Sequence, residues 1–412
     1  MTQTYRIPWA SWYEPKEFIL EFPDSWEVEI IESKLPPEII DEQKIKDRLN
    51  SPINARPLSE LAQDAQNAVI VVDDISRHTK AELVLSVVLE ILNDSGITDE
   101  QITIISALGG HRPMTRHDFI KKIGLSILDR VNVENHHPFL NLTYSGESKL
   151  KTPIYLNTTY ANADLKITVG GVIPHGLAGF GGGAKIVLPG VCGIKTLEAN
   201  HNASNKGIGI GIGHITQLRE DIEDVCSRVG LDFSINIIPG INGNPIGIFA
   251  GHYITAHRAA IELYKEIYEF ELPSKKKYDI GLFNAYPEDT ELSQSIKALN
   301  AYFLKPKMIS YRGGIVMLSA STEGRGFHSL SGQTGSPLYR EDRTDDIVWK
   351  IFGKRKIFFY SPNVTKADMK HFYPEFVEYH NSFQSLISEL ESNFGTNLKV
   401  CIVPSSIHLP KR

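Results

Sequence analysis

The chain has 412 residues, of which 42% are apolar and 22% are charged, and its net charge is -6 at neutral pH. This composition is typical of a folded globular protein with room for two domains. The acidic balance argues against nucleic acid or an anionic membrane surface as the main partner. The three cysteines form no CxxC pair, and the sequence shows no signal-peptide pattern and no apolar run long enough for a membrane span. We therefore expect a cytoplasmic protein.

The first part of the chain predicts alternating strands and helices. Residues 1–35 predict strands in YRIPWASW and EFILEF, and residues 36–50 predict a helix that begins at prolines. Further strands are predicted at 68–74, 102–110 and 163–172, and further helices at 80–96 and 115–124. This order is typical of βαβ units in a parallel sheet. Ligands bind at the carboxyl ends of such strands, which here read VVDDISRHT, ALGGHRPMT and GGVIPHG.

A second α/β unit is expected after the charged segment 271–279, which is the best candidate for a linker. Its predicted elements are the strand YDIGLFNA, the helix PEDTELSQSIKALNAYF, the strand GGIVMLSAS, the helix DDIVWKIFG, the strand KIFFYSP and the helix VEYHNSFQSLISELESNFG. We therefore predict two mixed α/β domains with largely parallel sheets and an active-site cleft between them. The first domain would be residues 1–274, to which 403–412 could return, and the second residues 275–402.

The segment 175–190, HGLAGFGGGAKIVLPG, contains six glycines around a lysine. Backbone N–H groups of such a loop can cradle a phosphate. The sequence is neither a Walker A motif nor a GxGxxG turn after the first strand. A flexible hinge would explain the glycines, but it would not need Lys185 or the apolar residues that follow. Lys185 itself could neutralise a phosphate, link covalently to a cofactor, or simply be solvated.

Histidines follow two of the predicted strand ends: His111 in GGHRPMT and His175 in VIPHG. A lone histidine is more often structural, but two at adjoining strand ends can serve as acid and base on opposite faces of a substrate. His201 lies sixteen residues after Lys185, on or just after a helix, and could bind a metal. No HxxxH or HExxH motif occurs, so a zinc hydrolase is not indicated.

Three other polar residues are candidates for substrate binding. Arg77 follows the first strand in DDISRHT and could bind a carboxylate through two hydrogen bonds, or it could pair with the neighbouring Asp73 and Asp74. Gln294 and Lys297 lie three residues apart in ELSQSIKAL and would share one face of a helix. They could reach the substrate across the cleft, or they could form an ordinary solvated face.

These pieces together resemble the nickel-dependent lactate racemase family. The segments that match, in family order, are SPINARPLSEL, DDISRHT, SALGGHRPMT, PHGLAGFGGGAKIVLPGVCG, LEANH, QSIK and STEGRGFHSL. The match covers essentially the whole chain, and the spacing of His175, Lys185 and His201 is its most specific part. Members of this family interconvert the stereoisomers of 2-hydroxy acids by proton-coupled hydride transfer through a transient 2-keto acid.

The resemblance implies a nickel pincer nucleotide, a pyridinium-3-thioamide-5-thiocarboxylic acid mononucleotide that would be linked covalently to Lys185. His201 would be the protein ligand of nickel, and His111 and His175 would be the acid–base pair. The cofactor would also contact Asp74, Gly179, Gly181, Gly182 and Gly183. The substrate would contact Arg77, Gln294 and Lys297. The enzymes that synthesise the cofactor are the implied partners, beside the small hydroxy acid itself.

The second domain departs from the lactate-specific pattern. Lactate racemases tend to have an aromatic residue beside the glutamine, where this chain has Ser293, and the nearby PEDTELSQ is strongly polar. Tyr360 or a neighbour would then be the aromatic near the cofactor. A polar pocket favours a hydroxy acid larger than lactate, such as a sugar acid, although lactate stays open. The alternatives are a non-catalytic cofactor-binding homologue, which would not need an acid–base pair, and a dehydrogenase, which would need the missing GxGxxG turn.

Overall fold

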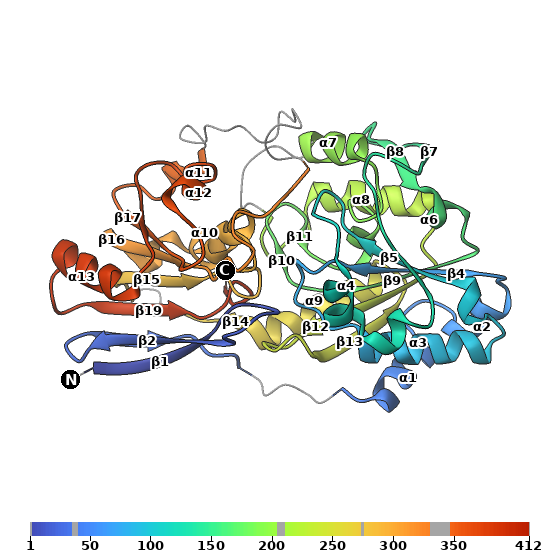
Figure 1. Ribbon diagram of the computed structural model, residues 1–412, viewed down its shortest axis with the longest axis horizontal. Helices are drawn as coiled ribbons and strands as arrows, with labels where there is room; N and C mark the ends of the chain where they lie inside the picture. The colour runs from blue at the N-terminus through green and yellow to red at the C-terminus, as the bar shows by residue number, and fades with distance from the viewer. Residues whose placement is uncertain (1, 35–39, 204–210, 273–275, 330–346, 412) are drawn as a thin grey trace.

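The computed structural model describes residues 2–34, 40–203, 211–272, 276–329 and 347–411. Two α/β halves lie side by side, and each is built on a six-stranded sheet (Figure 1). The predicted fold class, α/β with two largely parallel sheets, is therefore confirmed. In the described part of the chain, no helix is long and apolar enough to cross a membrane.

The sheet of the first half has the strand order β13-β12-β9-β4-β5-β6. Neighbouring strands are parallel except β12 and β13, which are antiparallel. The strands are β4 (Ala68–Asp73), β5 (Ile102–Ala107), β6 (Asn132–Asn135), β9 (Leu165–Gly171), β12 (Phe233–Pro239) and β13 (Pro245–Gly251). The three strands predicted in this part of the sequence are β4, β5 and β9. They are neighbours in the sheet, so their carboxyl ends meet at one edge.

Helices cover both faces of this sheet because successive residues of a strand point to opposite sides. Ile70 and Val72 of β4 belong to one core cluster, and Val69 and Val71 belong to another. The helices of this half are α1 (Glu42–Asn50), α2 (Leu58–Gln63), α3 (Glu82–Asp94), η1 (Asp99–Gln101), α4 (Arg116–Ile123), α5 (Leu125–Leu128), α6 (Thr158–Asn162), η2 (Gly183–Ile186), α7 (Ile194–Ala203), α8 (Gln217–Val229) and α9 (Thr255–Tyr268).

The helix predicted at 36–50 is shorter than expected. It begins at Glu42, because the side chain of Asp41 caps it by accepting a hydrogen bond from the Lys44 amide at 2.9 Å. Residues 36–39 of the predicted helix lie outside the described residues. Short pairs of strands complete this half: β7 (Leu142–Glu147) with β8 (Pro153–Asn157), and β10 (Pro174–His175) with β11 (Gly179–Phe180).

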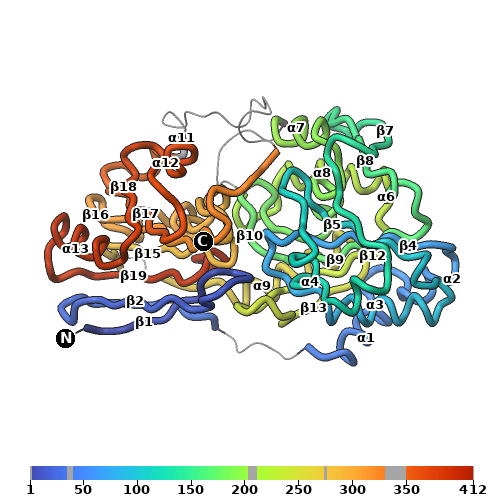
Figure 2. The backbone as a smooth tube through the Cα atoms, viewed as in Figure 1, coloured from blue at the N-terminus to red at the C-terminus, as the bar shows by residue number. Residues whose placement is uncertain are grey.

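The sheet of the second half has the order β18-β17-β16-β15-β19-β3, and all its neighbours are parallel. Its strands are β3 (Glu27–Ile30), β15 (Tyr278–Asn284), β16 (Ile309–Leu318), β17 (Lys356–Tyr360), β18 (Val377–His380) and β19 (Lys399–Val403). The hairpin of β1 (Thr2–Pro8) and β2 (Glu17–Pro23) lies beside this sheet (Figure 2). Its buried Trp9 and Phe22 belong to the same core cluster as residues of β15, β16 and β19.

The N-terminal strands therefore lie with the second half, whereas the sequence placed residues 1–34 in the first domain. The reason is the pairing of β3 with β19, which are more than 300 residues apart and whose contact no local pattern encodes. At the other end of the chain, β20 (Leu409–Pro410) pairs with β14 (Glu269–Phe270), the last strand of the first half. The chain thus crosses between the halves near both of its ends.

Two predicted helices of the second half form different structures. The segment PEDTELSQSIKALNAYF contains the 3-10 helix η3 (Leu292–Leu299) followed by α10 (Asn300–Leu304), and not one continuous α-helix. In the segment predicted last, VEYH pairs with β17 as a strand, and α13 (Phe383–Phe394) begins only after Ser382, which caps it. The remaining helices are η4 (Pro306–Met308), α11 (Ile347–Lys350) and α12 (Lys366–Met369).

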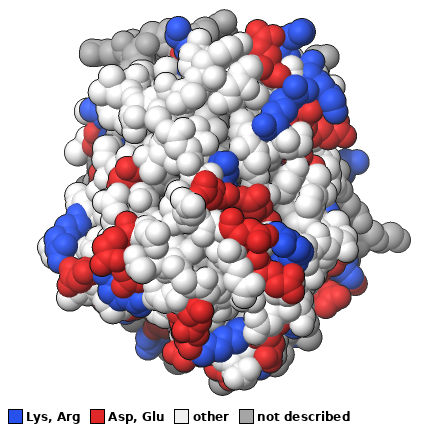
Figure 3. Space-filling view, turned by 90° about the vertical axis from the view of Figure 1, so that its right-hand side faces the viewer, with Lys and Arg blue, Asp and Glu red and all other residues white. Residues whose placement is uncertain are grey.

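The surface of the first half carries both signs of charge. On the face drawn in Figure 3, acidic and basic residues are interspersed and neither sign covers the whole face. This distribution agrees with the small negative net charge. It offers none of the broad basic surface that a nucleic acid would need on this face.

Candidate active site

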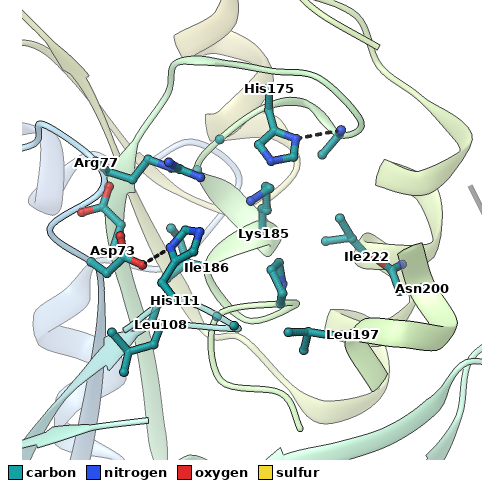
Figure 4. A pocket seen from close by; sticks show the side chains of 18 of the residues that line it. Asp73, Arg77, Leu108, His111, His175, Lys185, Ile186, Leu197, Asn200 and Ile222 are labelled. Atoms are coloured by element: carbon teal, nitrogen blue, oxygen red, sulfur yellow. Dashed lines mark hydrogen bonds and ion pairs between the residues drawn. The ribbon is translucent and has the colours of Figure 1, made fainter. Parts of the chain in front are cut away.

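A cavity lies at the carboxyl ends of β9, β4 and β5 (Figure 4). Eight of the candidate residues line it: Asp74 and Arg77 after β4, His111 after β5, His175 in β10, Gly181 and Gly182 before η2, Lys185 in η2 and His201 in α7. Figure 4 shows Arg77, His111, Lys185 and His175 converging on one centre from separate segments. The fold therefore brings together residues that are up to 124 positions apart in the sequence.

The glycines of the segment 175–190 are required mainly by contacts within the protein. Gly182 has a φ of +74°, and a Cβ there would lie 2.8 Å from Cγ2 of Val172. Gly179 has a φ of +78°, and a Cβ there would overlap the carbonyl oxygen of His214. Of the four glycines expected to contact the cofactor, Gly181 and Gly182 line the cavity. Gly179 and Gly183 are not among the described residues that line it.

Buried donors bind the carbonyl groups of the same segment. Arg219 of α8 is fully buried, and its guanidinium donates to the carbonyl oxygens of Ala178, Phe180 and Gly182. His257 of α9 lies 2.7 Å from the carbonyl oxygen of Gly181 through its Nε2 atom. Neither residue was predicted from the sequence, because each is one of several polar residues of an amphipathic helix. These contacts with the carbonyl oxygens of residues 178–182 fix the backbone shape of the glycine-rich segment.

Lys185 contributes the amine at the centre of the cavity. Burial lowers the pKa of its amine well below the ordinary value, and the charges of Arg77 and Arg219 lower it further. Within the described residues, no carboxylate lies within ion-pair distance of the amine. These surroundings favour the neutral amine, which is the nucleophilic form.

His111 has a carboxylate partner. Its Nδ1 atom lies 2.5 Å from Oδ2 of Asp74, and Ser76 also binds that carboxylate. Burial would raise the pKa of Asp74, but the charge and the hydrogen bond of His111 outweigh burial and hold that pKa below its ordinary value. Nδ1 of His111 therefore carries a proton, and Nε2 faces the amide nitrogen of Gln294 at 3.4 Å. Asp74, expected beside the cofactor, is thus the partner of His111 at the edge of the cavity.

His175 has backbone amides as partners instead. Its Nδ1 atom accepts hydrogen bonds from the amides of Leu177 at 3.3 Å and Ala178 at 3.1 Å. The neutral ring that fits these contacts carries its proton on Nε2. Burial lowers the pKa of His175 well below its ordinary value, and the charges of Lys185 and Lys297 lower it further.

His201 has the tautomer that a metal ligand needs. Its Nδ1–H donates to the carbonyl oxygen of Leu197 at 2.8 Å, one turn earlier on α7. The lone pair of the neutral ring is therefore on Nε2. Burial lowers the pKa of His201 to about 4, so the ring is neutral at physiological pH.

Residues 13–211 match the family model described as the lactate racemase N-terminal domain. The lactate racemase of Lactiplantibacillus plantarum is 28% identical over 309 residues, which are 71% of this chain and 70% of the relative. The lactate racemase of Thermoanaerobacterium thermosaccharolyticum is 25% identical over 356 residues, which are 83% of this chain and 80% of the relative. The chain belongs to the lactate racemase family.

Solved structures share the fold of this lactate racemase family member. The structure of the lactate racemase apoprotein from T. thermosaccharolyticum matches with a TM-score of 0.77 at 21% identity and covers 100% of both chains. A protein from Thermotoga maritima matches with a TM-score of 0.69 at 19% identity and covers 92% of this chain and 100% of that one. Both likenesses concern the architecture, and the first confirms that the two-sheet arrangement is that of a lactate racemase apoprotein.

Arg77 and Lys297 share a partner that was not predicted. Arg77 Nη1 lies 2.8 Å from Oε1 of Glu288, and the amine of Lys297 binds the same oxygen. The alternative that paired Arg77 with its neighbouring aspartates is therefore wrong, since Asp74 binds His111 and Asp73 lies 2.5 Å from the buried amine of Lys122. Gln294 and Lys297 are not among the described residues that line the cavity. Gln294 contacts the lining residue His111, and Lys297 binds Glu288, the partner of the lining residue Arg77.

The second half also contributes an unexpected ring. His328, in the matched segment STEGRGFHSL, lines the cavity, and its ring centre lies 5.0 Å from that of His111. Tyr360, by contrast, is packed in the core of the second half, where it stacks on Phe18 with ring centres 5.3 Å apart. It is not among the described residues that line the cavity. The ring nearest to His111 from the second half is thus an imidazole.

Proposed function

We propose that this protein racemises or epimerises a 2-hydroxy acid at C2 with a nickel pincer nucleotide linked to Lys185. One observation carries this proposal. Two histidines, one with an acceptor nitrogen and one with an N–H group, line the same cavity as a buried amine, and no carboxylate among the described residues lies within ion-pair distance of that amine. His111 presents an acceptor nitrogen, and His175 presents an N–H, on the cavity that also holds Lys185. Family membership supports the same reaction class.

The residues present fit the implied cofactor. Lys185 has the neutral amine that forms an amide-type link, and His201 has the tautomer with its lone pair on Nε2, which suits a borderline metal. The cations Arg77 and Arg219 lower the cost of placing an anionic phosphate near the glycine-rich segment. When bound, the cofactor would supply a cationic ring that accepts and returns the C2 hydride.

The side chains of the chain itself would manage the substrate and its proton. Nε2 of His111 would accept the hydroxyl proton of the substrate, and Asp74 would stabilise the imidazolium that forms. Nε2–H of His175 would donate a hydrogen bond to the C2 oxygen from the other side. Arg77 and Lys297 would hold the substrate carboxylate, and Gln294 would orient the ring of His111.

Co-expression with cofactor-synthesis enzymes tests the proposal. We expect a mass adduct that maps to Lys185, about one nickel ion per chain, and interconversion of the stereoisomers of at least one 2-hydroxy acid. The matched control is Lys185→Arg, which keeps a positive charge but has no nucleophilic amine. An adduct with nickel but without turnover of any 2-hydroxy acid would favour a cofactor-binding homologue. Unmodified mass without nickel would overturn the covalent attachment.

A further inference from the structure

Glu288 is a buried carboxylate placed between the two cations assigned to the substrate. It lies in the loop after β15 and has an exposed fraction of only 2%. Its Oε1 atom lies 2.8 Å from Nη1 of Arg77, which belongs to the first half, and it also binds the amine of Lys297 in η3. One carboxylate oxygen thus joins both cations across the junction of the two halves.

This arrangement is fixed by contacts on both sides. The carboxylate of Asp289 accepts hydrogen bonds from the backbone amides of Ala10 at 2.9 Å and Ser11 at 3.0 Å, which anchors the loop that carries Glu288. On the opposite side, the buried amine of Lys122 donates to the carbonyl oxygen of Arg77 at 2.9 Å. The triad of Arg77, Glu288 and Lys297 therefore joins two braced loops.

The triad sets the charge that a substrate meets. Arg77 and Lys297 bring two positive charges, and Glu288 removes one of them. The nearby carboxylate of Asp74 is hydrogen-bonded to the neutral ring of His111, keeps its own negative charge, and belongs to the His111 side of the cavity and not to the triad. The three residues of the triad together carry a net charge of +1, which matches one carboxylate. A second carboxylate on the substrate would lie near Glu288. Because the site is buried, little water is present to screen the repulsion between the two carboxylates.

We propose that Glu288 is a specificity-determining residue that restricts the site to hydroxy monocarboxylates and disfavours hydroxy dicarboxylates. This inference rests on the proposed function, because that function assigns Arg77 and Lys297 to the substrate carboxylate. Glu288 also keeps these two cations from repelling each other before substrate binds. The charge of the loop after β15, and not the volume of the cavity, would then decide which side chains a substrate can carry.

The test compares lactate with malate at equal ionic strength on the wild-type apoprotein and on Glu288→Gln. Thermal unfolding reports binding, since a ligand that binds the folded state raises the midpoint. We expect lactate to stabilise the wild type more than malate does. Glu288→Gln should raise the ratio of malate to lactate affinity about tenfold, because one negative charge is removed from a poorly screened site.

The matched control is Glu323→Gln. Glu323 also forms an ion pair between the halves, 2.6 Å from Arg112, but it does not contact the triad. We expect this variant to leave the ratio of malate to lactate affinity unchanged. If Glu288→Gln does not fold, the wild-type comparison still decides, because stabilisation by malate equal to or above that by lactate contradicts the proposal.

The inference and the proposed function fail in different ways. An unchanged ratio in Glu288→Gln, or no response of that variant to either acid, overturns the role of Glu288. Failure of the loaded wild type to interconvert any 2-hydroxy acid overturns the proposed function. It does not change the ratio of malate to lactate affinity of the apoprotein, which tests the role of Glu288 separately. In the loaded enzyme, the ratio of kcat/KM for malate and lactate should follow the same change in Glu288→Gln.

Discussion

The two sides of the cavity place a histidine in opposite electrostatic settings. His111 and His175 follow β5 and β9, the two strands that flank β4. On the His111 side, Asp74 offers a carboxylate at 2.5 Å. On the His175 side, the near partners are backbone amides, and the nearby charges are those of the cations Lys297 and Arg77. The same residue type at equivalent strand ends therefore has different proton chemistry.

This difference has a consequence for the direction of proton transfer. His111 is arranged to take a proton at Nε2, because Asp74 stabilises the resulting positive charge. For His175 to accept a proton at Nε2, its remaining proton would have to lie on Nδ1. The amides of Leu177 and Ala178 would then have to turn away from the ring. Reaction from the second face of the substrate thus requires a local rearrangement on the His175 side.

The largest effect is expected at Lys185, which contributes the amine of the His175 side. Lys185→Ala removes the only amine that lines the described cavity, so cofactor attachment should be lost and racemisation should fall to the uncatalysed rate. Intact mass and a stereoisomer assay of protein from a cofactor-producing host would measure both. Full activity with an adduct on another lysine would contradict the assignment.

The next largest effect is expected on the His111 side. Asp74→Asn keeps the shape of the partner but removes its charge, so kcat should fall by roughly 100- to 1000-fold, as when an orienting carboxylate is neutralised. Steady-state kinetics of fully loaded enzyme would show it. Ser76→Ala removes the hydroxyl contacts to Asp74, to Nδ1 of His111 and to Arg77 but changes no charge, so it should cost much less. Equal losses in the two variants would show that the charge is unimportant.

The two sides also predict different dependences of stability on pH. The pKa of folded His175 lies well below the unfolded value because of burial, so the unfolded chain binds the proton first. The free energy of unfolding should therefore fall as pH falls below about 6.5. The lowered pKa of Asp74 acts only at more acidic pH, since its contribution is complete above the unfolded value of about 4.

Urea unfolding between pH 7 and pH 5 would separate these contributions. His175→Gln removes the titrating ring, so its stability should decline less steeply with falling pH than that of the wild type. Asp74→Asn should leave the slope in this range nearly unchanged. A wild-type slope in the His175→Gln variant would mean that folded His175 is protonated, and the two sides would then be alike.

The smallest effect is expected at Gln294. Its amide makes one long hydrogen bond, 3.4 Å, to Nε2 of His111. Gln294→Ala should lower kcat/KM by about 3- to 10-fold, the cost of one modest hydrogen bond. Ser293→Ala is the control, because its hydroxyl binds Glu291 and not the histidine. A loss greater than 100-fold would assign Gln294 a direct role in the chemistry.

Much of the fold could be predicted from local pattern. Buried apolar runs located β4, β5 and β9, and several residues that follow these strands line the cavity. Local pattern was less informative where two structures suit the same residues. VEYH can extend a helix or pair as a strand, and the adjacent β17 decides for the strand. The 3-10 form of η3 likewise follows from its packing and not from its residue types.

By itself, the sequence determined the α/β class, the strand ends and the identity of the chemical groups, because periodicity and residue type are local properties. Only the tertiary structure decided how those groups are partnered. Glu288 is 211 residues from Arg77, Asp74 is 37 residues from His111, and His328 arrives from the second half. Such contacts depend on sheet order and on the docking of the halves. They set the partners of Arg77, Lys297 and His111, whereas the proton positions of His175 and His201 depend on backbone groups two to four residues away.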